Sequence, residues 1–189
     1  GSTGGADARG GGRRLVTVLP EGVAIRATTL PPAPADRAFL EHGMAALQEF
    51  ERAVEPNRLP GAEMAGAHVS ALLAAAMEGG GGALVAEDRA GPCGLLVYLV
   101  EHAFGRFVLP ENQRYGYISD LWVDPRIRGR GVASALIARA GRDLADLGCR
   151  RIEISAITAN SRAIRLYEAL GFSPDHVTLA RTLPGPDAP

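Results

Sequence analysis

The segment LWVDPRIRGRGVA, residues 121–133, decides the fold of this 189-residue chain. An apolar strand over residues 117–123 ends at an Asp-Pro pair, an Arg- and Gly-rich loop follows, and a strong helix begins near Arg130. At such a junction, several backbone N–H groups are presented at a helix N-terminus, where the macrodipole is positive. Glycines let the backbone approach an anion, and three arginines add positive charge. The segment therefore predicts a phosphate or pyrophosphate site.

Two other phosphate-binding motifs fit this segment less well. The P-loop motif G-x-x-x-x-G-K-[ST] requires a lysine, and the chain contains none. The dinucleotide fingerprint G-x-G-x-x-G/A could start at Gly129, but its last position would then be Ser134. An NAD(P)-dependent oxidoreductase and an ordinary Gly-rich turn therefore stay open as weaker alternatives.

The surrounding sequence alternates between helical and strand periodicity. The helix over residues 130–147 carries one apolar stripe, and Gly148 stands where a left-handed C-terminal cap belongs. A second helix of this half is expected to start at the N-cap Asn160 and to end at Gly171. The remaining expected elements are helices over residues 35–54 and 62–77, strands over residues 23–28, 83–87, 95–100, 151–157 and 176–182, and a long connection over residues 101–114. This order predicts an α/β fold with a central mixed, twisted sheet flanked by helices.

Two segments resemble a known family. Residues 128–133, RGRGVA, match the R/Q-x-x-G-x-G/A motif of the GCN5-related N-acetyltransferases (GNAT), and residues 160–172, NSRAIRLYEALGF, match that family's N-x-x-A-x-x-L-Y-x-x-x-G-F segment. The resemblance is strong over residues 116–172 and weakens towards residue 83. It implies the acyl-CoA N-acyltransferase (GNAT) fold. It also implies an enzyme that moves an acetyl group from acetyl-CoA to a primary amine by direct transfer in a ternary complex.

The resemblance also implies roles for individual residues. Backbone amides of the Arg-Gly loop would hold the coenzyme A pyrophosphate, and the strand before it would run beside the pantetheine arm and supply an oxyanion N–H. Asn160 would contact the pantetheine region, and Tyr167 would protonate the departing thiolate. The implied donor-binding residues are Leu121, Trp122, Val123, Arg128, Gly129, Arg130, Gly131, Val132, Ala133 and Asn160. Simpler interpretations stay open, because Tyr167 also fits an apolar core stripe and Asn160 also fits a helix cap.

The general base and the acceptor site are less defined. Related enzymes often place a glutamate on the strand that here contains Ser119 and Asp120. Asp120 is therefore the first candidate for the base, directly or through a water, and a buried structural carboxylate is the alternative. Weaker candidates are Glu153 and Glu111. The acceptor site is expected near the Pro-rich helical region and the connection after residue 100, whose candidate lining residues are His102, Phe104, Phe107 and Tyr115.

Composition excludes several other classes of function. The formal net charge is −1, which argues against a nucleic-acid partner. The four histidines lack metal-site spacing, so no metal is expected, and Cys93 and Cys149 fit small core residues. Neither a membrane-spanning run nor a signal-peptide layout is evident, so a cytoplasmic protein without a membrane partner is the expectation.

The expected organisation is a flexible tail over residues 1–20, one domain over residues 21–183 and a frayed end over residues 184–189. A homodimer is compatible with the resemblance. The sequence also leaves open a non-catalytic acyl-CoA-sensing or partner-binding module of the same fold.

Overall fold

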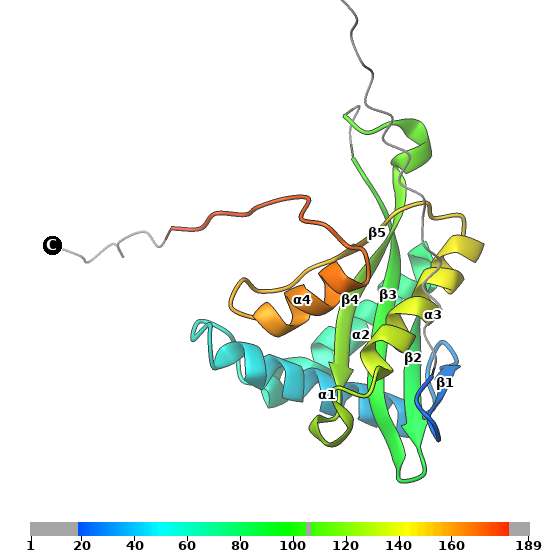
Figure 1. The fold of residues 1–189 in the computed structure, drawn as a ribbon, viewed down its shortest axis with the longest axis vertical. Helices are drawn as coiled ribbons and strands as arrows, with labels where there is room; N and C mark the ends of the chain where they lie inside the picture. The colour runs from blue at the N-terminus through cyan, green and yellow to red at the C-terminus, as the bar shows by residue number, and fades with distance from the viewer. Residues whose placement is uncertain (1–18, 105–106, 182–189) are drawn as a thin grey trace, which may run out of the picture.

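The computed structural model describes residues 19–104 and 107–181. Five strands among these residues form one mixed sheet (Figure 1). The strands lie in the order of the chain, and neighbours are antiparallel except for the last pair, which is parallel. The strands are β1 (Ala24–Ala27), β2 (Gly81–Asp88), β3 (Gly91–His102), β4 (Arg114–Val123) and β5 (Ile152–Ile154). The expected mixed α/β sheet is confirmed.

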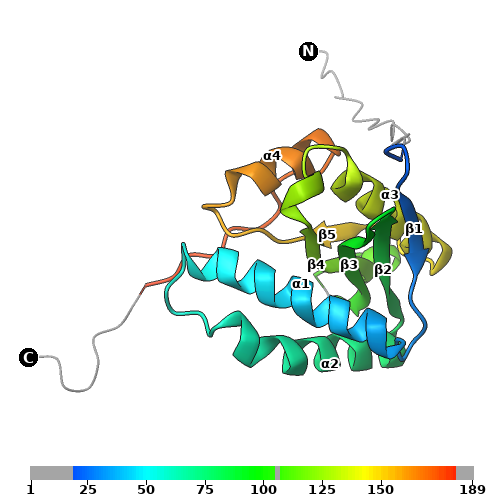
Figure 2. The same ribbon diagram turned by 90° about the horizontal axis from the view of Figure 1, so that it is seen from below.

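Helices cover both faces of this sheet (Figure 2). The antiparallel pair α1 (Pro34–Arg52) and α2 (Gly61–Gly79) packs on one face, and α3 (Val132–Asp146) packs on the other, with α4 (Ser161–Ala169) on the same side as α3. Two short 3₁₀ turns, η1 (Pro110–Asn112) and η2 (Pro125–Ile127), lie at the two ends of β4. The sheet is therefore the middle layer of three.

Each face of the sheet has its own hydrophobic core. The α3 side buries Leu136, Ala140 and Leu144 against alternate residues of β2 and β3. The α1/α2 side buries Leu40, Met44 and other helical residues against the intervening strand positions and Trp122 of β4. Burial of apolar surface on both faces holds β4 and its flanking helices in a fixed relation.

A β-bulge interrupts the alternation of β4. Val97 of β3 pairs with Asp120, whereas the next residue, Tyr98, pairs with Ile118, so Ser119 is the extra residue. A bulge changes the face to which the following side chains point. Ile118 accordingly packs in the α3-side core, while Trp122 packs in the α1/α2-side core, although the two are four residues apart. The bulge therefore turns Asp120 toward the helical hairpin of α1 and α2.

Two expected strands differ from the structure. The strand expected over residues 151–157 is only three residues long, because the chain leaves β4 after Ile154. The strand expected over residues 176–182 is not formed within the described residues 176–181, where Val177 and Leu179 are 81% and 90% exposed. The alternating apolar pattern does not pair with a strand in residues 176–181, so the prediction was wrong for those residues.

The remaining expectations on the termini fall largely outside the described ranges. Residues 1–18 and 182–189, which include most of the expected tail and all of the expected frayed end, lie outside them. Within residues 19–104 and 107–181, no helix combines the length and apolarity that a membrane span needs. Both cysteines are free and buried, as expected of core residues.

Candidate functional site

The loop between β4 and α3 has the backbone conformation that an anion site requires. Gly129 and Gly131 have φ angles of +80° and +85°, in the left-handed region that favours glycine. A Cβ built on either glycine would meet no heavy atom within 4 Å, so both face open space. Gly131 is the N-cap and carries no capping side chain, and the first helical hydrogen bond runs from the Ala135 N–H to the Gly131 carbonyl at 3.0 Å. The amides of the first turn are therefore left for an external acceptor.

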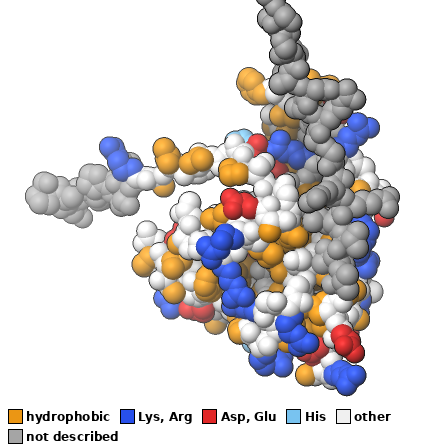
Figure 3. All heavy atoms as spheres, viewed as in Figure 1, with side chains coloured by type: hydrophobic (Ala, Val, Ile, Leu, Met, Phe, Trp, Pro, Cys, Tyr) orange, Lys and Arg blue, Asp and Glu red, His pale blue; other side chains and the backbone are white. Residues whose placement is uncertain are grey.

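Arginines gather around this loop. Figure 3 shows basic side chains over α4 and over the segment between β4 and α3. The Arg128 Nε donates to the Val123 carbonyl at 2.8 Å, which fixes its guanidinium beside the end of β4. Burial, and then the nearby charge of Arg162, lower the pKa of Arg128 below its ordinary value. A bound anion would relieve this repulsion, as a phosphate group does.

One arginine of the loop is already engaged. The Arg126 guanidinium folds back on Asp124 at 2.8 Å, and the Arg126 N–H donates to the same carboxylate at 2.9 Å. The Asp124 side chain thus caps η2 and fixes the turn that leaves β4. Arg126 therefore shapes the loop, while Arg128 and the exposed Arg130 supply its uncompensated charge.

Among the described residues, no strand pairs with the β5 side of β4 beyond Ile118, where the Val123 carbonyl accepts from Arg128. Pairing with β5 stops at Ile118, while β4 continues to Val123. The Trp122 side chain is 6% exposed and packs edge-on against the rings of Phe39 and His42, at centroid distances of 6.0 and 5.6 Å. Leu121 packs against the opposite core. Of residues 121–123, the backbone rather than the Trp122 side chain is thus open to a ligand on the β5 side.

The helix α4 carries the two other residues implied by the resemblance. The Asn160 Oδ1 accepts a hydrogen bond from the Ala163 N–H at 3.1 Å, which confirms Asn160 as the N-cap. Tyr167 packs against the α3-side core, and its ring lies 6.1 Å from that of Phe172. Burial, with a smaller contribution from Glu51, raises the pKa of Tyr167 to about 12. The phenol therefore stays protonated at neutral pH and lies within electrostatic range of Glu51.

A cleft of about 380 Å³ opens between the α1/α2 hairpin, the middle of β4 and the chain that follows β5. Its wall combines two methionines and other apolar side chains with hydroxyl, amide and charged groups. The lining residues are Met44, Leu47, Gln48, Glu51, Arg58, Met64, His68, Tyr117, Ser119, Asp120, Ser155, Ala156 and Ile157. Asp120 lies here because of the bulge, and not as a carboxylate that satisfies turn amides.

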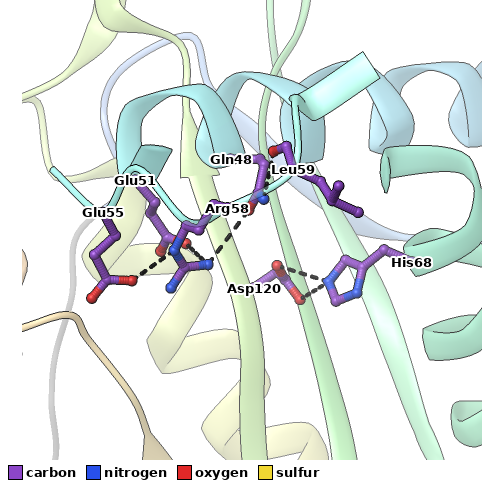
Figure 4. Close-up of polar contacts among 7 residues, drawn as sticks. All are labelled: Gln48, Glu51, Glu55, Arg58, Leu59, His68 and Asp120. Atoms are coloured by element: carbon purple, nitrogen blue, oxygen red, sulfur yellow. Dashed lines mark hydrogen bonds and ion pairs between the residues drawn. The ribbon is translucent and has the colours of Figure 1, made fainter. Parts of the chain in front are cut away.

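Two side chains contact Asp120, and Figure 4 shows one of them, His68. The His68 Nε2 lies 3.1 and 3.3 Å from its two carboxylate oxygens, and the Ser119 hydroxyl donates to Oδ2 at 2.7 Å. The hydrogen bond with Asp120 raises the pKa of His68, burial opposes this rise, and the charges of Asp120 and Glu51 add to it. A histidine and a carboxylate are thus coupled on the wall of the cleft.

A second charged group faces the same space. The Arg58 guanidinium contacts Glu51 at 2.7 Å and Glu55 at 2.8 Å. Burial raises the pKa of Glu51, Arg58 opposes this rise, and the charge of Asp120 adds to it. Two carboxylates, Glu51 and Asp120, therefore line the cleft beside one arginine and one titratable histidine. When the histidine is neutral, the acidic groups outnumber the arginine, which suits a cationic ligand.

The structure shows which residues predicted from the sequence as general base or acceptor-site lining lie in the cleft. It places Asp120 in the cleft, whereas neither Glu111 nor Glu153 lines it. The four residues expected to line an amine pocket do not line it either, and Phe104 and Phe107 are 96% and 97% exposed. The connection between β3 and β4, which carries Phe104 and Phe107, projects beyond the sheet (Figure 1). Of the two regions expected to form the acceptor site, only the helical region contributes to this cleft.

Sequence reasoning missed several residues of this cleft. His68 occupies a position on the inner side of α2 and is separated from Asp120 by 52 residues. Glu51 and Arg58 lie at the end of α1 and in the turn after it, where they resemble ordinary surface charges. Only the helical periodicity of α1 and α2 could have indicated that one face of this hairpin meets β4.

Comparison with known proteins gives a family match. Residues 47–172 match the model of the family described as "Acetyltransferase (GNAT) family". A segment of 55 residues is 36% identical to the thialysine N-epsilon-acetyltransferase of Bos taurus, and it covers 29% of this chain and 32% of that protein. A segment of 57 residues is 42% identical to the N-alpha-acetyltransferase MAK3 of Arabidopsis thaliana, and it covers 30% of each. The matches span about a third of the length of these relatives.

Solved structures share the fold over a larger part of the chain. A GCN5-related N-acetyltransferase from Ralstonia eutropha JMP134 superposes with a TM-score of 0.65 at 23% identity, over 87% of this chain and 100% of that one. The aminoglycoside N-acetyltransferase AAC(6')-Iy, in complex with CoA, superposes with a TM-score of 0.60 at 21% identity, over 87% of this chain and 99% of that one. At these identities the likeness shows the fold alone.

Proposed function

The chain belongs to the acetyltransferase (GNAT) family, and from this premise we propose that it transfers the acetyl group of acetyl-CoA to a primary amine by direct transfer in a ternary complex. One observation carries the proposal. Asp120 of β4 lines a cleft in which carboxylates outnumber the arginine, and the same strand runs on through the edge at residues 121–123 to the Gly-rich loop at the N-terminus of α3. Such a site can hold a phosphorylated donor on one side and a cationic acceptor on the other.

The residues of the loop and of β4 fit acetyl-CoA as donor. In the proposal, backbone amides of residues 128–133 bind the pyrophosphate, with the open space above Gly129 and Gly131 as the required clearance. The edge at Leu121, Trp122 and Val123 receives the amide groups of the pantetheine arm as a strand would. Asn160 keeps its role as the cap of α4 and contacts the same arm.

The transfer needs one proton acceptor and one proton donor. The acceptor arrives as an ammonium ion and loses a proton to the group formed around Asp120, because only the free amine is a nucleophile. The amine nitrogen then bonds to the thioester carbon while a backbone N–H of residues 121–123 stabilises the oxyanion. As the carbon–sulfur bond breaks, the Tyr167 hydroxyl gives its proton to the thiolate, and the second proton of the acylated nitrogen passes through water to the Tyr167 oxygen and restores the hydroxyl. Neither buried cysteine is needed, because no covalent enzyme intermediate forms.

The acceptor class follows from the cleft and from the relatives. Its charges favour a cationic amine, and its methionines favour an aliphatic chain next to that amine. The names of the relatives suggest three probes, which are thialysine, a peptide with a free N-terminus and an aminoglycoside. We include a homodimer and a cytoplasmic location in the proposal as expectations carried over from the sequence.

The test begins with donor binding. Saturating acetyl-CoA at about 100 times its dissociation constant adds about 2.7 kcal/mol to the free energy of unfolding. For a protein of this size, that corresponds to a rise in Tm of about 5–10 °C. Parallel samples contain ATP or NAD, and the three amine probes are then assayed by release of free coenzyme A thiol. No shift with acetyl-CoA, or a shift with NAD alone, would contradict the proposal.

A non-catalytic acyl-CoA-sensing module of the same fold is the second candidate. It is favoured by the serine and aspartate on the β4 segment where related enzymes often carry a glutamate. Such a module would show the thermal shift with acetyl-CoA but would release no thiol with any of the amines.

A further inference from the structure

The pair formed by His68 and Asp120 is asymmetric. The Asp120 side chain is 12% exposed, whereas that of His68 is 34% exposed. Both line the cleft, but the imidazole is the more exposed of the two side chains, while the carboxylate on β4 is the more buried. A proton that leaves an amine in the cleft therefore meets the imidazole more readily than the carboxylate.

Hydrogen bonds also engage both carboxylate oxygens of Asp120. Its carboxylate accepts from the Ser119 hydroxyl at 2.7 Å. Both of its oxygens contact the His68 Nε2 (Figure 4). A carboxylate beside Nε2 keeps the proton of the neutral ring on that nitrogen. The other ring nitrogen, Nδ1, then carries the lone pair. This is the arrangement of a general base oriented by a buried carboxylate.

We propose that His68 is the general base of the acetyl transfer and that Asp120 is its positioning residue. This inference rests on the proposed function and replaces Asp120 as the group that accepts the proton. The ammonium proton of the acceptor passes to Nδ1 of His68, and the freed nitrogen lone pair forms the bond to the thioester carbon. The carbon–sulfur bond breaks and the thiolate takes the Tyr167 proton, while the second proton of the acylated nitrogen passes through water to the Tyr167 oxygen and restores its hydroxyl. Asp120 stabilises the imidazolium until it releases its proton to solvent.

The charges around His68 set the pH dependence of this step. Asp120 faces it from β4 and Glu51 from α1, and the nearest cation in the cleft, Arg58, is paired with Glu51. The hydrogen bond with Asp120 raises the pKa of His68 above its ordinary value of 6.5. Because only the neutral ring can accept a proton, kcat/KM should fall as the pH decreases through that raised pKa.

The experiment compares kcat/KM against pH for the wild type, His68→Gln and Asp120→Asn, with acetyl-CoA and the best of the three amine probes. His176→Gln is the matched control, because it removes an imidazole that is 82% exposed and lies outside the cleft. We expect His68→Gln to lower kcat/KM by about 10²–10⁴-fold and to remove the acidic limb of the profile. Asp120→Asn should move that limb to lower pH, and His176→Gln should match the wild type.

A chemical rescue separates catalysis from a structural role of the histidine. In His68→Ala, added imidazole should restore part of the rate, while the Tm shift caused by acetyl-CoA should equal that of the wild type. A His68→Gln variant with the rate and pH profile of the wild type would overturn the role of His68 and leave the proposed function standing. A wild type that binds acetyl-CoA but acetylates no amine would overturn both.

Discussion

The two halves of the candidate site are built in different ways. The donor side is contiguous, because residues 121–133 supply the strand edge, the loop and the helix N-terminus in a single segment. The cleft is discontinuous, because α1, α2, β4 and the chain after β5 each contribute only a few side chains. In the proposed function, the donor side acts through backbone groups and the cleft through side chains. It follows that substitutions should affect donor binding through backbone conformation and acceptor chemistry through charge.

The largest effect should come from Tyr167 of α4, the proposed proton donor. Tyr167→Phe removes the proposed proton donor and should lower kcat by about 10²–10⁴-fold. Donor affinity should change little, because the ring and its packing against Phe172 remain. Steady-state kinetics and a thermal shift with acetyl-CoA measure the two quantities separately.

Tyr98→Phe is the matched control for this variant. Burial raises the pKa of Tyr98 to about 12, as it does for Tyr167, but the Tyr98 hydroxyl donates to Asp143 and lies outside the cleft. The control should keep the kcat of the wild type. Because a phenol with a pKa of about 12 stays protonated below pH 11, Tyr167 should add no alkaline limb to the kcat profile in that range. A normal kcat in Tyr167→Phe would remove this residue from the mechanism.

The next effect concerns the backbone of the donor side. Gly131→Ala forces a Cβ on a residue with φ of +85°, which costs about 1–2 kcal/mol. The loop of the free protein can relax this strain, but donor binding must restore the left-handed conformation. The dissociation constant of acetyl-CoA should therefore rise by about 5–30-fold, since 1.4 kcal/mol corresponds to tenfold. Isothermal titration calorimetry with acetyl-CoA checks this value.

Gly148→Ala introduces the same backbone strain at a position away from the candidate site. Gly148 has a φ of +84°, follows α3 at its opposite end, and also has no heavy atom within 4 Å of a built Cβ. This variant should lose a similar amount of stability and keep the donor affinity of the wild type. Equal donor affinities in the two variants would show that the loop before α3 does not contact the donor.

The same contrast explains what the sequence could predict. The donor segment contains its glycines, its arginines and the start of a helix within 13 residues, and the structure confirms that helix. The helix caps expected at Asn160 and Gly148 are also confirmed. The cleft has no such local pattern. The position of Asp120 depends on a one-residue bulge, and His68 reaches it only through the packing of α2 on the sheet. The strand over residues 176–182 failed because periodicity indicates a strand but not a partner edge.

The smallest effect tests whether the cleft acts as one electrostatic unit. Glu51 is the weakest of the groups that raise the pKa of His68, and the hydrogen bond with Asp120 is the strongest. Glu51→Gln should therefore move the acidic limb of the kcat/KM profile to lower pH, by less than Asp120→Asn does. Glu55→Gln is the control, because Glu55 also pairs with Arg58 but does not line the cleft. Equal shifts for the two glutamate variants would mean that Arg58, rather than Glu51, sets the electrostatic potential at His68. Arg58 would then be the residue that determines the electrostatics of the cleft.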